Sequence, residues 1–234
     1  MVFLMLVPLL AGLEYLNITN KSNFIKFLFA AILIAAISFS AYQYPQYNHY
    51  LLYVSIFINL ALILNMYVGD AFIKHNKGTV FIFAFYIACP FVLAMLFYQL
   101  HHHKLLLFAS MVLIWISDSG AYFVGSQIGK NKLFPKISPG KTWEGLIGAG
   151  MLTLISAYIF SSFDNTHDFR FWTGFALIIW IMGVYGDLVA SHVKRLYQIK
   201  DSGTILPGHG GFFDRFDAFI FIMPFILLYI TLSS

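Results

Sequence analysis

The chain has 234 residues, of which 60% are hydrophobic and only 10% are charged, whereas soluble domains usually carry about 25% charged residues. This composition excludes an ordinary soluble enzyme, and the mean hydropathy of +0.79 is typical of a chain embedded in a bilayer. The net charge of +4 comes with no basic stripe interleaved with exposed aromatic residues, so we expect no nucleic-acid partner.

Apolar stretches close to the ~20 residues that cross a bilayer recur along the whole chain. In chain order they predict eight spans, at residues 2–16, 26–42, 51–69, 79–98, 105–124, 142–160, 171–190 and 217–232. We therefore predict an all-α fold, a polytopic bundle of about eight transmembrane helices that forms one integral membrane domain over residues 1–234. The first stretch ends in Glu14 and Tyr15 rather than in small residues, so a removable signal peptide is not expected.

Lysines and arginines divide unequally between the two sides that these spans define. The loops after the first, third, fifth and seventh spans hold 12 of the 14, and only Lys104 and Arg170 fall on the other side. Because cytoplasmic loops are enriched in basic residues, we expect these four loops to face the cytoplasm and both termini to face outward.

Carboxylates fall at one depth in this arrangement. With a rise of ~1.5 Å per helical residue, Asp118 lies about 20 Å and Asp187 about 24 Å from the outer face. Glu14 lies at the cytoplasmic end of the first span, and Asp214 and Asp217 lie at the cytoplasmic entry to the last. Because an intramembrane acid is a functional-site candidate, we predict a polar cavity that opens to the cytoplasm.

The densest polar run of the chain is residues 191–217. If the seventh span continues as a helix, Ser191, Lys194 and Arg195 share a face with Asp187. At the other end of the run, two aspartates three residues apart project to the same side of a helix, as oxygen ligands of Mg²⁺ would. A solvated helix cap is an equally good interpretation of the aspartate pair, Asp214 and Asp217.

Two loops offer contacts for phosphate. Residues 207–211 have the sequence PGHGG, whose successive backbone N–H groups can cradle phosphate oxygens; an ordinary turn between helices is the alternative for this loop. The segment 138–145 lies at the cytoplasmic start of the sixth span, where a helix N-terminus favours anions. Helix capping with a positive-inside lysine is the alternative for its polar residues, which are Ser138, Lys141 and Thr142.

These residues resemble the signature of the phosphatidate cytidylyltransferases, also called CDP-diacylglycerol synthases. The resemblance rests on an ordered set: Ser191, Lys194, Arg195, Lys200, Asp201, Gly203, Pro207, His209, Gly210, Gly211, Asp214, Arg215 and Asp217. Residues 118–122, 138–145 and 186–187 also resemble family blocks in the expected order. The half at 105–234 is therefore expected to bear the catalytic motifs, and 1–104 is less specific.

The resemblance implies that CTP and phosphatidate give CDP-diacylglycerol and pyrophosphate, with Mg²⁺ as cofactor and a second cation left open. It implies metal ligands at Asp187, Asp214 and Asp217, with Asp118 as a further ligand or an orienting partner. Together with Asp187 and Asp214, the catalytic groups are Lys194, Arg195 and Lys200. The residues that it implies for substrate binding are Ser138, Lys141, Thr142, Ser191, Asp201, His209, Gly210, Gly211 and Arg215.

Two other functions remain open on the sequence alone. A CTP-dependent polyprenol or phytol kinase is also polytopic with acid-rich cytoplasmic loops, and a cation transporter also gathers intramembrane acids. Transport favours acids at the midplane and inverted repeats, which the sequence does not display. We expect a bacterial inner-membrane protein whose partners are CTP and phosphatidate, and whether it forms a homodimer is left open.

Overall fold

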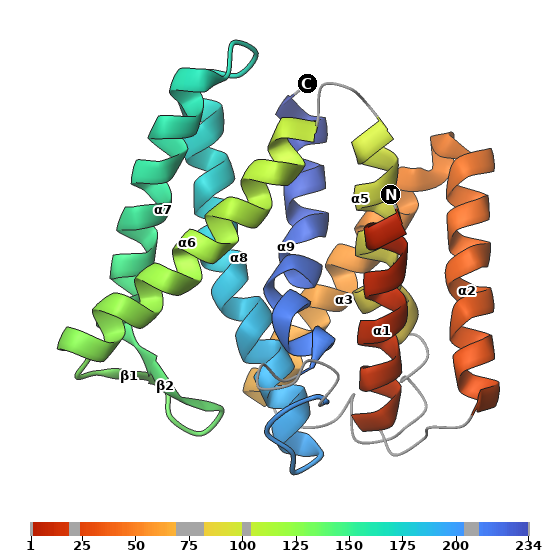
Figure 1. The fold of residues 1–234 in the computed structure, drawn as a ribbon, viewed down its shortest axis with the longest axis horizontal. Helices are drawn as coiled ribbons and strands as arrows, with labels where there is room; N and C mark the ends of the chain where they lie inside the picture. The colour runs from red at the N-terminus through yellow and green to blue at the C-terminus, as the bar shows by residue number, and fades with distance from the viewer. Residues whose placement is uncertain (1, 19–23, 69–81, 100–103, 204–210, 234) are drawn as a thin grey trace.

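The computed structural model describes residues 2–18, 24–68, 82–99, 104–203 and 211–233, which form a helical bundle with one small sheet (Figure 1). Helical segments occur at all eight positions that hydropathy predicts. The α-helices are α1 (Val2–Ile18), α2 (Phe24–Gln43), α3 (Asn48–Val68), α5 (Cys89–Gln99), α6 (Lys104–Ile128), α7 (Trp143–Phe163), α8 (Phe169–Leu196) and α9 (Phe212–Ser233). A 3-10 turn, Pro45–Tyr47, precedes α3, and a π-helical segment, Phe83–Ala88, leads into α5.

Within these described ranges, five helices are long and apolar enough to cross a bilayer: Pro45–Val68, Lys104–Ile128, Trp143–Phe163, Phe169–Leu196 and Phe212–Ser233. Two shorter apolar stretches accompany them, Ala31–Gln43 and Ala84–Tyr98. The chain is therefore an integral membrane protein. The count of eight spans stays a prediction.

The helices alternate in direction, and this sorts the molecule into two ends (Figure 1). The start of α1 and the end of α9 lie together at one end. The small sheet, the end of α8 and the start of α9 lie at the other. The segments that carry most of the predicted site residues are thus gathered at one end of the bundle.

Helix α9 is the most enclosed of the five long helices, with 61% of its apolar window buried. Its side chains are apolar on nearly every face, as expected of a helix surrounded by others. Trp172 and Phe175 of α8 and Phe221 of α9 belong to the same buried cluster, and each is completely shielded from solvent. Aromatic side chains from both helices therefore contribute to the core between α8 and α9.

Two glycines allow helices to approach closely beside the polar end of the bundle. A Cβ on Gly186 of α8 would lie 2.7 Å from the Phe221 Cβ, and one on Gly145 of α7 would lie 2.7 Å from the Ala121 carbonyl oxygen of α6. Small residues at such crossings bring helix backbones together within membranes. Because Gly186 directly precedes Asp187, this close contact fixes the depth of that acid relative to α9.

A β-hairpin departs from the purely helical prediction. Strand β1 (Lys132–Phe134) pairs antiparallel with β2 (Ser138–Thr142), between α6 and α7. Glu144 in the first turn of α7 accepts hydrogen bonds from the backbone N–H groups of Lys130 and Asn131, both at 3.2 Å, and so ties the base of the hairpin to the helix. The all-α prediction describes the bundle but misses this element.

Helix α8 ends without the glycine that usually follows a helix. Gln198 adopts a positive φ of 58°, and the N–H of Ile199 donates to the Lys194 carbonyl oxygen at 3.1 Å while that of Gln198 donates to the Arg195 carbonyl oxygen at 3.0 Å. This pair of bonds is a Schellman motif. It turns the chain sharply after Leu196 and directs the following residues back toward α9.

Candidate active site

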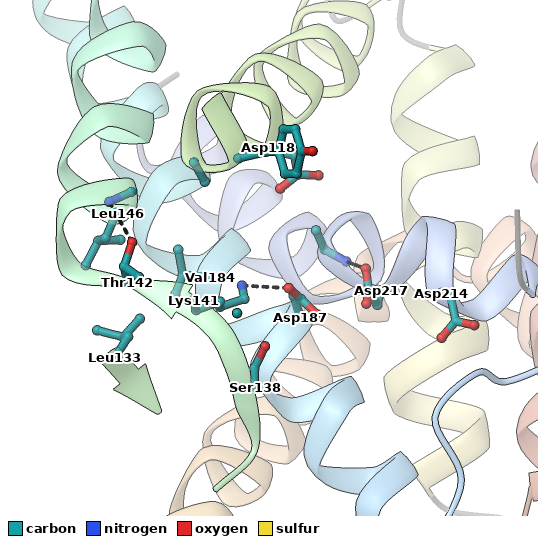
Figure 2. A pocket seen from close by; sticks show the side chains of 15 residues that line it. Asp118, Leu133, Ser138, Lys141, Thr142, Leu146, Val184, Asp187, Asp214 and Asp217 are labelled. Atoms are coloured by element: carbon teal, nitrogen blue, oxygen red, sulfur yellow. Dashed lines mark hydrogen bonds and ion pairs between the residues drawn. The ribbon is translucent and has the colours of Figure 1, made fainter. Parts of the chain in front are cut away.

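A cavity of about 410 Å³ opens between α6, the hairpin, α7, α8 and α9. Figure 2 shows side chains from these elements converging on it. Its apolar wall includes Ala121, Leu133, Leu146 and Val184. Its polar wall consists of residues that the sequence had singled out: Asp118, Ser138, Lys141, Thr142, Asp187, Asp214 and Asp217.

The hairpin contributes a lysine to this cavity. Lys141 Nζ lies 2.6 Å from Asp187 Oδ2, an ion pair that joins β2 to α8 (Figure 2). The side chains are 24% and 40% exposed, so solvent reaches both partners. Ser191 Oγ donates to the other carboxylate oxygen of Asp187 at 3.2 Å, as the four-residue spacing on a helix predicts.

A second ion pair joins α8 to α9 and is more deeply placed. Lys194 Nζ lies 2.6 Å from Asp214 Oδ1, and the side chains are 11% and 13% exposed. The other oxygen, Oδ2, accepts from the Ser202 N–H at 2.8 Å, and the Ser202 hydroxyl lies 2.9 Å away. Gly211 N–H adds a longer bond at 3.2 Å. Both oxygens of Asp214 therefore hold protein donors.

Two further aspartates face the cavity from different helices. Asp217 of α9 is 8% exposed, and its Oδ1 accepts from the Ala218 N–H at 2.7 Å. Asp118 of α6 lies on a separate wall from Asp187 and Asp217 (Figure 2). Asp214 and Asp217, three residues apart on α9, both line the cavity.

Among the described residues, the other predicted site residues lie around this cavity rather than in its wall. Gly211 and Ser191 bond the aspartates named above. Arg195 is exposed, and its Nη1 donates to the Ile199 carbonyl oxygen at 3.1 Å, within its own turn. Lys200, Asp201 and Arg215 are also exposed. His209 and Gly210 lie outside the described residues.

Sequence reasoning missed two groups that shape the site. Ser202 bonds Asp214, but no role was predicted for Ser202. The sequence around it, between Asp201 and Gly203, indicated only a short polar turn after α8. Glu144 falls within the segment 138–145, and no role was predicted for it either. An acid in the first turn of a helix is expected to interact favourably with backbone N–H groups. The sequence does not indicate that the N–H groups bound by Glu144 belong to residues before the hairpin.

The donor set fits a hard divalent cation in its chemistry. Mg²⁺ prefers oxygen ligands and is usually held by one or two carboxylates, with waters and substrate phosphates completing the shell. Asp187 and Asp217 offer such oxygens in one cavity. Within the described ranges, no three His, Cys, Asp or Glu residues come close enough to form a metal site alone. The arrangement therefore suits a metal that is shared with a bound phosphate.

The charges around the cavity suit a ligand that carries a cation as well as phosphate. Four carboxylates line the cavity, and Lys141 and Lys194 are each paired with one of them. A ligand that is both phosphorylated and metal-bound would satisfy the lysines and the remaining carboxylates together.

Comparison with known proteins gives consistent matches. The profile of the cytidylyltransferase family matches residues 1–233. The phosphatidate cytidylyltransferase of Staphylococcus aureus (strain COL) is 35% identical over 235 residues, which covers 97% of this chain and 87% of the relative. The enzyme of the same name from Bacillus subtilis (strain 168) is 41% identical over 177 residues, covering 75% of this chain and 66% of the relative.

Proposed function

Because this chain belongs to the cytidylyltransferase family, we propose that it transfers the cytidylyl group of CTP to phosphatidate, giving CDP-diacylglycerol and pyrophosphate. The observation that carries the proposal is a cavity at one end of a membrane bundle that is lined by four carboxylates and Lys141, with Lys194 paired to one of these carboxylates, Asp214. One substrate is a water-soluble triphosphate and the other is a lipid, and a polar cavity among apolar helices is accessible to both.

The reaction needs no nucleophilic side chain. A phosphate oxygen of phosphatidate attacks the α-phosphorus of CTP, the bond from that phosphorus to the bridging oxygen breaks, and pyrophosphate leaves with the electron pair. Such a transfer depends on in-line positioning and on neutralising negative charge. The protein groups that can do this are the cationic side chains and backbone N–H donors around the cavity.

Lys141 and Lys194 have distinct parts in this proposal. Lys141 is the more exposed of the two and lies on the hairpin beside the cavity. When CTP binds, this lysine leaves its ion-pair partner Asp187 and pairs with the triphosphate. Lys194 stays oriented by Asp214 and supplies a fixed positive charge to the developing pyrophosphate. Ser138 and Thr142 add hydroxyl donors from the same strand. Arg195, Lys200 and Arg215 are assigned a longer-range attraction for anions.

Mg²⁺ is part of the proposal: Asp217 would hold it, together with Asp187 once Lys141 leaves Asp187 Oδ2 for the triphosphate, and Asp118 stands on the facing wall. When bound, it neutralises phosphate charge and aligns the triphosphate. Asp214 takes part as a ligand only if the ion displaces Lys194 Nζ or the Ser202 N–H, because both of its oxygens are engaged. Its proposed first role is therefore to orient Lys194.

We propose eight spans, a bacterial inner membrane and a cytoplasmic active site, as the distribution of lysines and arginines indicates. Exposed tyrosines around the α2–α3 connection support this placement, because Tyr and Trp gather at membrane interfaces. These are Tyr42, Tyr44, Tyr47, Tyr50 and Tyr53. They lie near the end of the bundle away from the cavity, which is the outward end in this topology.

The proposal is tested with purified protein in detergent–phosphatidate micelles, supplied with CTP labelled at either the α- or the γ-phosphate, with and without Mg²⁺. A cytidylyltransferase moves only the α-label into lipid. Transfer of the γ-label to a polyprenol or phytol would instead identify a lipid kinase and overturn the proposal. Loss of α-label transfer in Asp217→Asn, with the fold retained, would tie the activity to this cavity.

A further inference from the structure

Glu14 is the only charged residue in the first 20 positions of the chain. It lies near the end of α1 and is 2% exposed. A buried carboxylate in an apolar helix is costly unless it is well hydrogen-bonded. Its bonding partners therefore indicate what the charge is for.

Those partners belong to the segment that carries the family signature, almost 200 residues away. Glu14 Oε2 accepts from the Phe213 N–H at 2.8 Å and from the Ser202 hydroxyl at 2.9 Å. Phe213 is in the first turn of α9, where backbone N–H groups lack partners within the helix. Glu14 thus caps α9 from another helix, and its negative charge faces the positive end of the helix dipole.

The backbone around the carboxylate is shaped to admit it. A Cβ added to Gly203 would lie 2.7 Å from Glu14 Oε1, and one added to Gly211 would collide with both Ser202 Oγ and Glu14 Oε2. Glycine at these two positions lets the chain close around the acid from both sides. The Tyr15 ring, next in α1, lies 6.1 Å from the Phe213 ring and packs against the same turn.

Ser202 links this buried acid to the cavity. Its Oγ lies 2.9 Å from Glu14 Oε2 and 2.9 Å from Asp214 Oδ2, and Asp214 Oδ1 in turn lies 2.6 Å from Lys194 Nζ. Removing the Glu14 carboxylate would free both Ser202 and the first turn of α9. Asp214 and Lys194 would then lose part of the support that fixes their direction.

We propose that Glu14 is a positioning residue for the transfer reaction: it clamps the two ends of the 202–213 segment and thereby orients the Asp214–Lys194 pair. Its effect on turnover rests on the proposed function, whereas the clamp itself does not. The inference gives the N-terminal helix a part in the site.

The test compares Glu14→Ala and Glu14→Gln with a control on the same helix, Val7→Ala, since Val7 is equally buried but belongs to the hydrophobic cluster. Misplacement of a catalytic group by about 1 Å can cost about 100-fold in rate, so Glu14→Ala should lose about that much in kcat. Its KM for phosphatidate should stay unchanged. Glu14→Gln keeps one oxygen that can accept from Ser202 and Phe213, so it should retain activity within about tenfold of the parent.

Hydrogen exchange provides a readout that does not depend on turnover. In Glu14→Ala, peptides that cover Ser202 and Phe213 should exchange faster, whereas in Val7→Ala they should match the parent protein. Parent-like kcat and exchange in Glu14→Ala would overturn the inference, and so would the same losses in Val7→Ala. If Glu14→Ala does not fold, the kcat of Ser202→Ala is measured instead. A reduced kcat in Ser202→Ala would support the proposed clamp, and a kcat equal to that of the parent protein would refute it. An inactive parent protein would refute the proposed function alone, since exchange would still test the clamp.

Discussion

The two ion pairs of the site have the same length but different surroundings, and loss of each lysine should therefore have different consequences. Lys141–Asp187 and Lys194–Asp214 both have an N–O distance of 2.6 Å. The side chains of the first pair are 24% and 40% exposed, whereas those of the second are 11% and 13% exposed. Water can replace Lys141 beside its partner, but it has little access to the place of Lys194.

The expected magnitudes follow from this difference. Exposed ion pairs contribute about 0.2–1 kcal/mol, so Lys141→Ala should change the free energy of unfolding by less than about 1 kcal/mol. Removing one partner of a buried pair leaves an uncompensated charge and costs about 3–5 kcal/mol. Asp214 keeps its bonds from Ser202 and Gly211, which places Lys194→Ala at about 3 kcal/mol.

Unfolding in mixed micelles, followed by the fluorescence of the four tryptophans, measures both variants, with the exposed Lys200→Ala as the control for loss of a positive charge. Turnover with CTP and phosphatidate separates function from stability. Lys141→Ala should raise the KM for CTP while leaving the unfolding midpoint near that of the control. If Lys141→Ala and Lys194→Ala lowered the free energy of unfolding equally, the argument that the more buried ion pair contributes more to stability would be refuted.

Three other outcomes are expected. Asp217→Asn should lower turnover by about 100-fold, or about 2.7 kcal/mol, and raise the Mg²⁺ concentration needed for half-maximal rate; an unchanged Mg²⁺ profile would remove Asp217 from the metal site. Gly186→Val should destabilise the bundle by about 1–3 kcal/mol in the same unfolding assay, because the close α8–α9 contact leaves no room for the side chain. Between α7 and α8, burial raises the pKa of Asp164, but hydrogen bonds from Thr166 and His167 outweigh it and hold that pKa below its usual range. The folded-state pKa is thus the lower one, so the carboxylate stabilises the protein above about pH 4 and this contribution is lost as the pH falls through the folded value. Asp164→Asn should therefore flatten the acid side of a plot of unfolding midpoint against pH.

Hydropathy predicted the helices because a bilayer forces apolar residues into runs of nearly fixed length. It could not predict the hairpin between α6 and α7. That segment contains Pro135, Pro139 and Gly140, has no alternating apolar pattern, and is held by Glu144 bonding residues that lie before the first strand. Local sequence does not encode such a contact.

The polar site could be predicted in part for a similar reason. Depth along a helix follows from counting residues, and counting alone predicted one level for Asp118, Asp187 and Asp217. Pairing between helices depends on their rotation and contact, which counting does not give. Spacing placed Lys194 beside Asp187 on α8, but the lysine reaches across to Asp214 of α9. The role of Ser202 was hidden because its partners come from α1 and α9.

The junction of β2 with α7 ties the site to the scaffold. Thr142 Oγ1 accepts from the Gly145 N–H at 3.2 Å and so caps α7, and the same residue lines the cavity directly after Lys141. The lysine is therefore one peptide unit from the base of a helix, while Glu144 holds the start of the hairpin on that same helix. A substitution that moves Lys141 within the cavity would therefore also change how the helix begins.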